Sequence, residues 1–216
     1  MIILVLAPRL SGSWGLALAL GVFAAGAALA ARAMHHSYPH TTLGLCNVIT
    51  MSRLALTAII ASLLASQQAP SEGELWLAFG IAAVSLLLDG GDGLAARRSG
   101  LASRFGARFD MEVDALFALV LALLAFRTGQ AGLWVVALGL PRYAFAAASG
   151  IWPQLAGDVP DNRSRKAVCV LQIGTLVAFL VPVLPATLLT TAAGVAALAL
   201  LWSFQRDIHF LIARAE

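Results

Sequence analysis

Residues 88–115 read LDGGDGLAARRSGLASRFGARFDMEVDA, and this stretch decides how the rest of the chain is interpreted. It contains four aspartates in two pairs, Asp89 with Asp92 and Asp110 with Asp114. The members of the pairs are three and four residues apart, so on helices each pair presents both carboxylates on one face. Each pair also adjoins an apolar run long enough to cross a membrane, about 20 residues. We therefore expect four carboxylates to gather at a small patch of membrane helix.

Four clustered carboxylates repel one another unless positive charge lies between them. Hard divalent cations such as Mg²⁺ prefer carboxylate oxygen, so the spacing favours a metal site. The structural alternative is a network of salt bridges to the arginines of the same stretch, Arg97, Arg98, Arg104 and Arg108. That network would not explain the glycines between the aspartates. A charged side chain within a span costs about 2.5–3.5 kcal/mol on insertion scales, so four together indicate a function.

The spacing of the stretch resembles a known signature, D-x-x-D-G-x-x-A-R-x8-G-x3-D-x3-D, of the CDP-alcohol phosphotransferase family of integral membrane enzymes. Its fixed positions are Asp89, Asp92, Gly93, Ala96, Arg97, Gly106, Asp110 and Asp114. Upstream, Asn47, Thr50 and Arg53 resemble more loosely the N-x-x-T-x-x-R pattern of the family's first core helix. The resemblance covers about residues 45 to 205.

The resemblance implies a reaction and roles for the four aspartates. A substituted phosphate group would pass from a CDP-linked donor to an alcohol, with release of CMP and with Mg²⁺ or Mn²⁺, two ions being expected. Asp89, Asp92 and Asp110 would be metal ligands, and Asp114 would be the general base that also touches a metal ion. The alternative that Asp114 is a ligand only stays open, because spacing alone does not rank the four.

A second set of residues is expected, by the same resemblance, to bind the cytidine nucleotide. It consists of Asn47, Thr50, Gly93, Ala96, Arg97 and Gly106. Arg53 would line the same pocket, and Gly106 would leave clearance for the ligand. Two alternatives remain here. Asn47 or Thr50 can cap the helix that begins near them, and Arg97 can be an ordinary positive charge beside a span.

Two groups of basic residues are candidates for binding the acceptor. Arg142 is the only charged residue within its apolar segment, where it would hold an acceptor phosphate or pair with an aspartate. Arg163, Arg165 and Lys166 form a basic cluster at the start of another segment. A phosphorylated acceptor or anionic lipid headgroups would suit this cluster equally.

Composition places the chain in a membrane. Of its 216 residues 60% are hydrophobic and 12% are charged, whereas a soluble domain has about 25% charged residues. Seven apolar segments of near-spanning length run over 14–33, 50–66, 75–96, 107–127, 131–151, 167–184 and 187–205. The predicted fold is an all-α membrane protein with a six-helix core and one extra N-terminal helix. Residues 1–40 form the extra helix and 41–216 the enzyme domain.

Charge distribution predicts the orientation and partners. Eleven basic residues lie in alternate gaps between segments, against two in the others, and this positive-inside bias places the aspartates on the cytoplasmic side. A net charge of +3 is too small to indicate nucleic acid. The favoured setting is a bacterial inner membrane, with CDP-diacylglycerol as donor, an unidentified alcohol as acceptor and a homodimer implied by the family. The alternatives are CDP-choline or CDP-ethanolamine donating to a lipid alcohol, and a cation or proton transporter.

Overall fold

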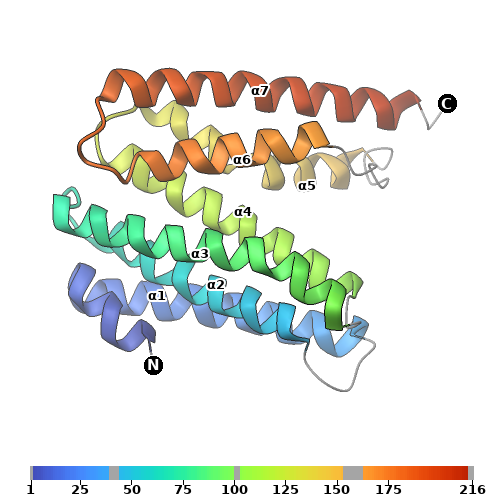
Figure 1. The fold of residues 1–216 in the computed structure, drawn as a ribbon, viewed down its shortest axis with the longest axis horizontal. Helices are drawn as coiled ribbons and strands as arrows, with labels where there is room; N and C mark the ends of the chain where they lie inside the picture. The colour runs from blue at the N-terminus through green and yellow to red at the C-terminus, as the bar shows by residue number, and fades with distance from the viewer. Residues whose placement is uncertain (1, 39–43, 100–102, 153–162, 214–216) are drawn as a thin grey trace. The chain divides into compact units, whose positions relative to one another are not determined.

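The computed structural model describes residues 2–38, 44–99, 103–152 and 163–213, with the side chains of 8–10, 36–37, 91–99, 163 and 212–213 outside the description. Within these ranges every regular element is helical (Figure 1). The elements are α1 (Ile2–Ser37), α2 (Leu45–Ala61), η1 (Ser62–Ala65), α3 (Glu72–Ser99), α4 (Arg104–Arg127), η2 (Leu133–Gly139), α5 (Pro141–Ile151), α6 (Arg163–Ala178) and α7 (Ala186–Ala213). The predicted all-α class is confirmed.

Helix length and apolarity agree with a membrane protein. Among the described residues four helical stretches are long and apolar enough to cross a membrane, Ser11–His35, Leu45–Ala65, Glu72–Gly90 and Ala186–Leu211. The pair η2 and α5 adds a fifth if the two helices, which are bent by 66°, form one broken span. Pro141 begins the second helix of the pair, where its missing N–H costs no helical hydrogen bond.

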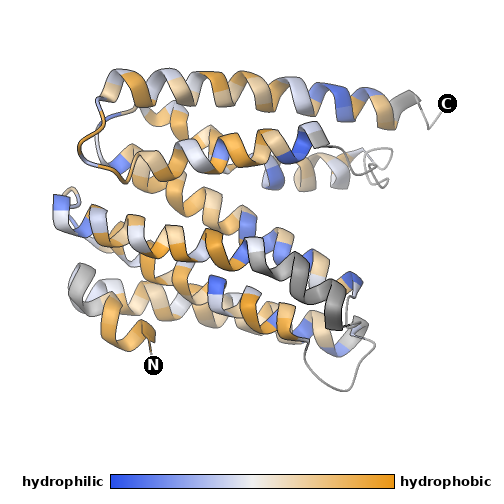
Figure 2. Cartoon of the chain, in the orientation of Figure 1, coloured by the Kyte–Doolittle hydropathy of each residue, from blue (hydrophilic) through white to orange (hydrophobic). Residues whose placement is uncertain are grey.

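Seven spans were expected, but length and apolarity identify at most five among the described residues. Helices α4 and α6 are the two expected spans that are not long and apolar enough. The first half of α4 carries five charged residues, Arg104, Arg108, Asp110, Glu112 and Asp114. Figure 2 shows hydrophilic colouring in the N-terminal part of α4. Helix α6 is only 16 residues long, shorter than the roughly 20 that cross a hydrocarbon core.

The chain divides into two compact units, Met1–Val120 and Leu121–Glu216. In the first unit α2 packs against both α1 and α3 (Figure 1). This central place explains the long buried face of α2, which runs from Asn47 to Ala61 and includes the polar residues Thr50 and Arg53. The N-terminal part of α4 completes the unit through a hydrophobic cluster with α1 and α2.

Helix α1 is broken near its start and then continues as one long helix. Gly12 has φ of +66°, in the left-handed region where residues with a Cβ are strained. Glycine adopts this conformation without strain, so the helix breaks there. Further along, Gly26 lies against Leu54 of α2. A Cβ on Gly26 would come within 2.7 Å of the Leu54 side chain. The glycine therefore allows the close approach of α1 to α2.

The C-terminal end of α1 also contacts the start of α4. The Tyr38 hydroxyl accepts a hydrogen bond from the backbone N–H of Gly44 at 3.0 Å. The Tyr38 ring packs edge-on against Phe105, with 5.7 Å between the ring centroids, and Phe105 stacks on Phe109 at 5.9 Å. Phe109 directly precedes Asp110. The N-terminal helix thus packs on the part of α4 that carries the aspartates.

Removal of the Phe105 ring should lower the stability of the first unit. We expect Phe105→Ala to destabilise the protein by about 3–5 kcal/mol, because a buried ring is replaced by a cavity. Thermal unfolding in detergent checks the expectation. Phe126→Ala is the matched control, since Phe126 lies on the same helix and is 41% exposed. Equal melting temperatures for the two variants would contradict the importance of the contact.

In the second unit α6 packs on α7, and η2 contacts both α5 and α7. The buried Gln172 side chain of α6 donates a hydrogen bond to the backbone carbonyl of Leu138 in η2. Near the other end of α6, the Arg165 Nε atom lies 3.1 Å from Asp207 Oδ2 of α7. These polar contacts join α6 to its two neighbours.

Candidate active site

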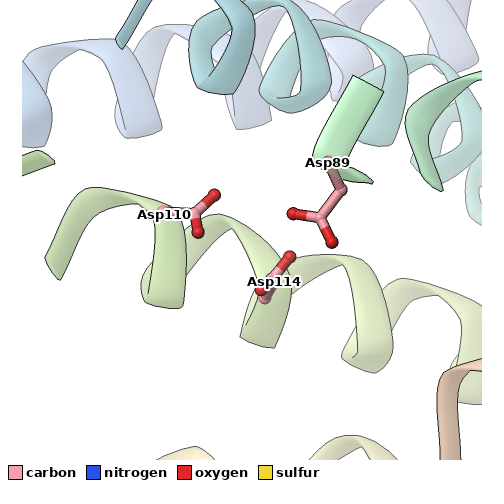
Figure 3. A group of neighbouring side chains, drawn as sticks. All are labelled: Asp89, Asp110 and Asp114. Carbon is pink, nitrogen blue, oxygen red and sulfur yellow. The ribbon is translucent and has the colours of Figure 1, made fainter. Parts of the chain in front are cut away.

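Three of the four aspartates converge on one point in the first unit. Asp89 comes from α3, and Asp110 and Asp114 come from successive turns of α4 (Figure 3). One carboxylate oxygen from each lies within 4.8 Å of the others. The three side chains are 36–40% exposed, so the group is open to a ligand. The predicted clustering is confirmed for these three residues, and the side chain of Asp92 lies outside the description.

Helical periodicity explains the pairing on α4. Asp110 and Asp114 are four residues apart and share one face of the helix. Their neighbours Phe109 and Val113 are buried in the hydrophobic cluster with α1 and α2. Burial of these two side chains fixes the rotation of α4 about its axis, and the aspartate face is directed toward Asp89 as a consequence.

A single guanidinium binds all three carboxylates. Arg53 lies on α2 and is 1% exposed. Its Nη1 atom is 2.7 Å from Asp89 Oδ1 and 2.7 Å from Asp110 Oδ1, and its Nη2 atom donates to Asp114 Oδ1. The aspartates therefore do pair with an arginine, Arg53, which the salt-bridge alternative did not name. Of the four arginines that it did name, Arg97 and Arg98 have side chains outside the description.

The sequence placed Arg53 at the nucleotide pocket and counted it among the positive-inside charges, and so missed its contact with the aspartates. A signal was present: Arg53 is a lone basic residue followed by the apolar run of α2, and intramembrane charges usually have a partner. Its partners are 57 and 61 residues away along the chain for Asp110 and Asp114. No local pattern identifies a partner at that separation.

The carboxylate group fits a divalent cation in chemistry, charge and size. Its donors are hard carboxylate oxygens, which Mg²⁺ and Mn²⁺ prefer. Three ionised carboxylates and one guanidinium leave an excess of two negative charges, which one divalent cation neutralises. Mg²⁺ binds oxygen at about 2.0–2.1 Å, so its ligand oxygens lie no more than about 4.2 Å apart. The oxygens of Asp89, Asp110 and Asp114, which lie within 4.8 Å of one another, are close to that range.

Asn47 and Gly106 form a second contact between α2 and α4. Asn47 is 4% exposed, and its Oδ1 atom lies 2.8 Å from where a Cβ on Gly106 would be. The space at Gly106, expected as clearance for a ligand, is thus filled by the Asn47 side chain. The Asn47 Nδ2 atom is buried and has no hydrogen-bond partner among the described residues. It is a buried donor on the face of α2 that also carries Arg53.

The capping alternative for Asn47 and Thr50 is excluded. Helix α2 begins at Leu45, its N-cap is Gly44, and no side chain makes a cap hydrogen bond there. The Thr50 hydroxyl instead donates to the backbone carbonyl of Cys46 at 3.0 Å. Both side chains lie on the buried face of α2 that also carries Arg53.

Comparison with known families agrees with this geometry. The model of the CDP-alcohol phosphatidyltransferase family matches residues 43–204. The chain belongs to this family. It is therefore a membrane transferase that moves a phosphate-linked group from a CDP-alcohol, and the transporter alternative has no support. No curated protein and no solved structure matches the chain.

The family match contains every predicted site residue, although the structure describes them unequally. The side chains of Asp92, Gly93, Ala96, Arg97 and Arg163 lie outside the description, so their roles stay predictions. Helix α3 itself continues through these α3 positions to Ser99. The N-terminal helix α1 precedes the matched segment, yet it packs on α2 and on the aspartate-bearing part of α4.

The acceptor candidates lie in the second unit. Arg142 is the second residue of α5, directly after the bend that separates this helix from η2. Arg165 is paired with Asp207, which also lies 3.4 Å from Arg206, so the two arginines share one carboxylate. The neighbouring Arg206 donates to the Ser164 hydroxyl and lies over the Trp202 ring at 5.1 Å. Acceptor binding by Arg142, Arg163, Arg165 and Lys166 stays a prediction.

The Asn47 contact makes a prediction for Gly106. We expect Gly106→Ala to destabilise the protein by about 1–3 kcal/mol, because the new methyl group meets a buried amide oxygen. Asn47→Ala in the same chain should relieve that overlap. Thermal melting of both variants measures the effect. Gly80→Ala is the control, since nothing lies within 4 Å of a Cβ at that helical position. A Gly106→Ala variant as stable as this control would contradict the contact.

Proposed function

We propose that the protein transfers a phosphatidyl group from CDP-diacylglycerol to an alcohol and releases CMP, as a step of phospholipid synthesis. The convergence of Asp89, Asp110 and Asp114 on one point carries the proposal. Support for a lipid donor comes from the apolar helices of spanning length, two of which, α2 and α3, carry Arg53 and Asp89. We place the reaction in a bacterial inner membrane. The positive-inside bias supports a site that faces the cytoplasm.

In this reaction Asp89, Asp92 and Asp110 would hold Mg²⁺ or Mn²⁺, and Asp114 would touch a second ion. The bound metal would neutralise the pyrophosphate of the donor and polarise the phosphorus that is attacked. The protein's own contribution is to fix the carboxylates through helices α2, α3 and α4. Asp89 and Asp110 are fixed by sharing one nitrogen of Arg53, so their spacing is set before a ligand arrives.

Asp114 would act as the general base. Its carboxylate would take the proton of the acceptor hydroxyl as the oxygen bonds to the phosphorus next to the diacylglycerol group. The phosphorus–oxygen bond to CMP breaks, and CMP leaves with the electron pair. The Arg53 contact uses Asp114 Oδ1, so the second carboxylate oxygen is available for the proton.

The nucleotide and the acceptor would be bound by the two predicted sets of residues. Asn47, Thr50, Gly93, Ala96 and Arg97 would bind the cytidine nucleotide, and Gly106 would serve that pocket by making room for the Asn47 side chain. Arg142, with Arg163, Arg165 and Lys166, would bind a phosphorylated acceptor. A homodimer is the assembly that we expect from the family.

The acceptor role of Arg142 makes a kinetic prediction. A charge-assisted hydrogen bond contributes about 1.5–3 kcal/mol, so Arg142→Ala should raise the acceptor KM about tenfold or more with a small change in kcat. Steady-state CMP release at varied acceptor concentration measures both constants. Arg127→Ala is the control, because Arg127 ends α4 away from the predicted cytoplasmic side. An unchanged KM together with a lower melting temperature would favour a pairing role for Arg142.

The proposed reaction is tested by CMP release from purified protein in detergent. CDP-diacylglycerol and Mg²⁺ are supplied, and glycerol 3-phosphate, serine, inositol, inositol phosphate and choline are offered one at a time. Metal-dependent release with one acceptor confirms the reaction and identifies the product. Release only from CDP-choline or CDP-ethanolamine with diacylglycerol would reverse the direction of lipid transfer. No release in either arm from folded protein would contradict the proposal.

A further inference from the structure

We propose that Arg53 is the resident counter-ion of the carboxylate site. It holds Asp89, Asp110 and Asp114 together while no divalent cation is bound, and it lowers the affinity of the site for that cation. The inference rests on the proposed metal site, and it assigns to Arg53 a positioning role that the family signature does not define.

Burial shows that Arg53 is fixed by the fold rather than by chance contact. It is among the largest side chains that are fully buried, with 1% exposure, and the next turn of α2 is formed by the buried residues Leu54, Thr57 and Ala58. Guanidinium groups stay charged in proteins, and a buried charge is costly unless it is paired. The three aspartates supply that pairing, and the Nε atom has no described partner of its own.

The contacts of Arg53 tie three helices together. Through Nη1 it binds Asp89 of α3 and Asp110 of α4, and through Nη2 it binds Asp114 of α4. The planar fork of the guanidinium provides several donors in fixed directions, which the single ammonium of lysine does not. Without this cation three carboxylates would face one another at close range, and their repulsion would separate α3 from α4.

The contacts with Arg53 use one oxygen of each aspartate. All three are made to Oδ1 atoms, so the second oxygens of Asp89 and Asp110 can bind a cation, and that of Asp114 can bind a cation or take the acceptor proton. A divalent cation bound there would lie close to the guanidinium and be repelled by it. Arg53 therefore holds the three carboxylates together and also lowers the affinity of the site for the divalent cation. The lower affinity favours reversible metal binding.

The test compares Arg53→Met with the wild-type chain and with Arg32→Met, a control at an exposed position of α1. All proteins are purified with Mn²⁺ and then treated with chelator. Mn²⁺ binding is measured by electron paramagnetic resonance, and thermal melting is measured with chelator and with Mn²⁺. We expect Arg53→Met to bind Mn²⁺ on the order of tenfold more tightly, because a nearby positive charge has been removed. Its melting temperature in chelator should be lower than that of the wild type, and its rise on adding Mn²⁺ larger.

Equal or weaker Mn²⁺ binding by Arg53→Met, or an unchanged melting temperature in chelator, would overturn the proposal. Should Arg53→Met fail to fold, Arg53→Lys replaces it, since that variant keeps one positive charge. It should melt lower than the wild type in chelator, with Mn²⁺ affinity within about threefold of wild type. Wild-type melting of Arg53→Lys in chelator would overturn the proposal as well.

Metal binding and CMP release are separate measurements, so the two proposals can fail independently. Tight Mn²⁺ binding by Arg53→Met without CMP release from the wild type would contradict the proposed reaction and support the role of Arg53. Absence of Mn²⁺ binding by both proteins would overturn the role of Arg53.

Discussion

Asp114→Asn is expected to reduce the rate of CMP release by about 10²–10⁴-fold, the usual contribution of a general base. Asparagine has nearly the same shape as aspartate and keeps an oxygen that can accept the hydrogen bond from Arg53. It cannot take the proton of the acceptor hydroxyl at neutral pH. Chemistry is therefore lost while the contact between α2 and α4 is kept.

The measurement pairs the rate of CMP release with binding of CMP and with thermal melting. Nucleotide binding should stay close to that of the wild type, and added Mn²⁺ should not restore the rate. Glu112→Gln is the matched control, since Glu112 is an exposed acidic residue on the same helix. Turnover by Asp114→Asn comparable to that of this control would remove the general-base role and leave Asp114 as a ligand only.

Asp89→Asn should also inactivate the protein, but through the metal. The substitution lowers the excess negative charge of the group from two to one, so affinity for Mg²⁺ should fall on the order of tenfold or more. Asp89 is the one described carboxylate of the group that α3 supplies. We expect activity at low metal concentration to be lost and to return in part as the metal concentration is raised.

This response distinguishes Asp89 from Asp114. A titration of CMP release against Mg²⁺ should shift to higher concentration for Asp89→Asn, whereas for Asp114→Asn the maximum rate should fall at every concentration. Removal of metal from the wild type by chelator should abolish release, and added Mg²⁺ or Mn²⁺ should restore it. An unshifted titration for Asp89→Asn would exclude it as a metal ligand.

Sequence reasoning was most successful where the information is local. The spacing of Asp110 and Asp114 predicts a shared helical face because 3.6 residues make one turn, and the structure confirms it. The spans predicted at 14–33 and 187–205 are likewise confirmed as long apolar helices. Their apolarity is a property of one stretch of sequence and does not depend on which other helices pack against it. The count of spans was harder, because the charges of α4 and the short α6 depart from a simple apolar run.

The sequence by itself determined the membrane class, the family and the residues of the carboxylate group, because composition, fixed spacing and helical period are properties of single segments. Only the tertiary structure decided that Arg53 binds the aspartates and that Asn47 fills the space at Gly106. Both contacts join α2 to helices far along the chain. They depend on which faces of α2, α3 and α4 pack together, and that packing is set by the burial of many side chains at once rather than by any one motif.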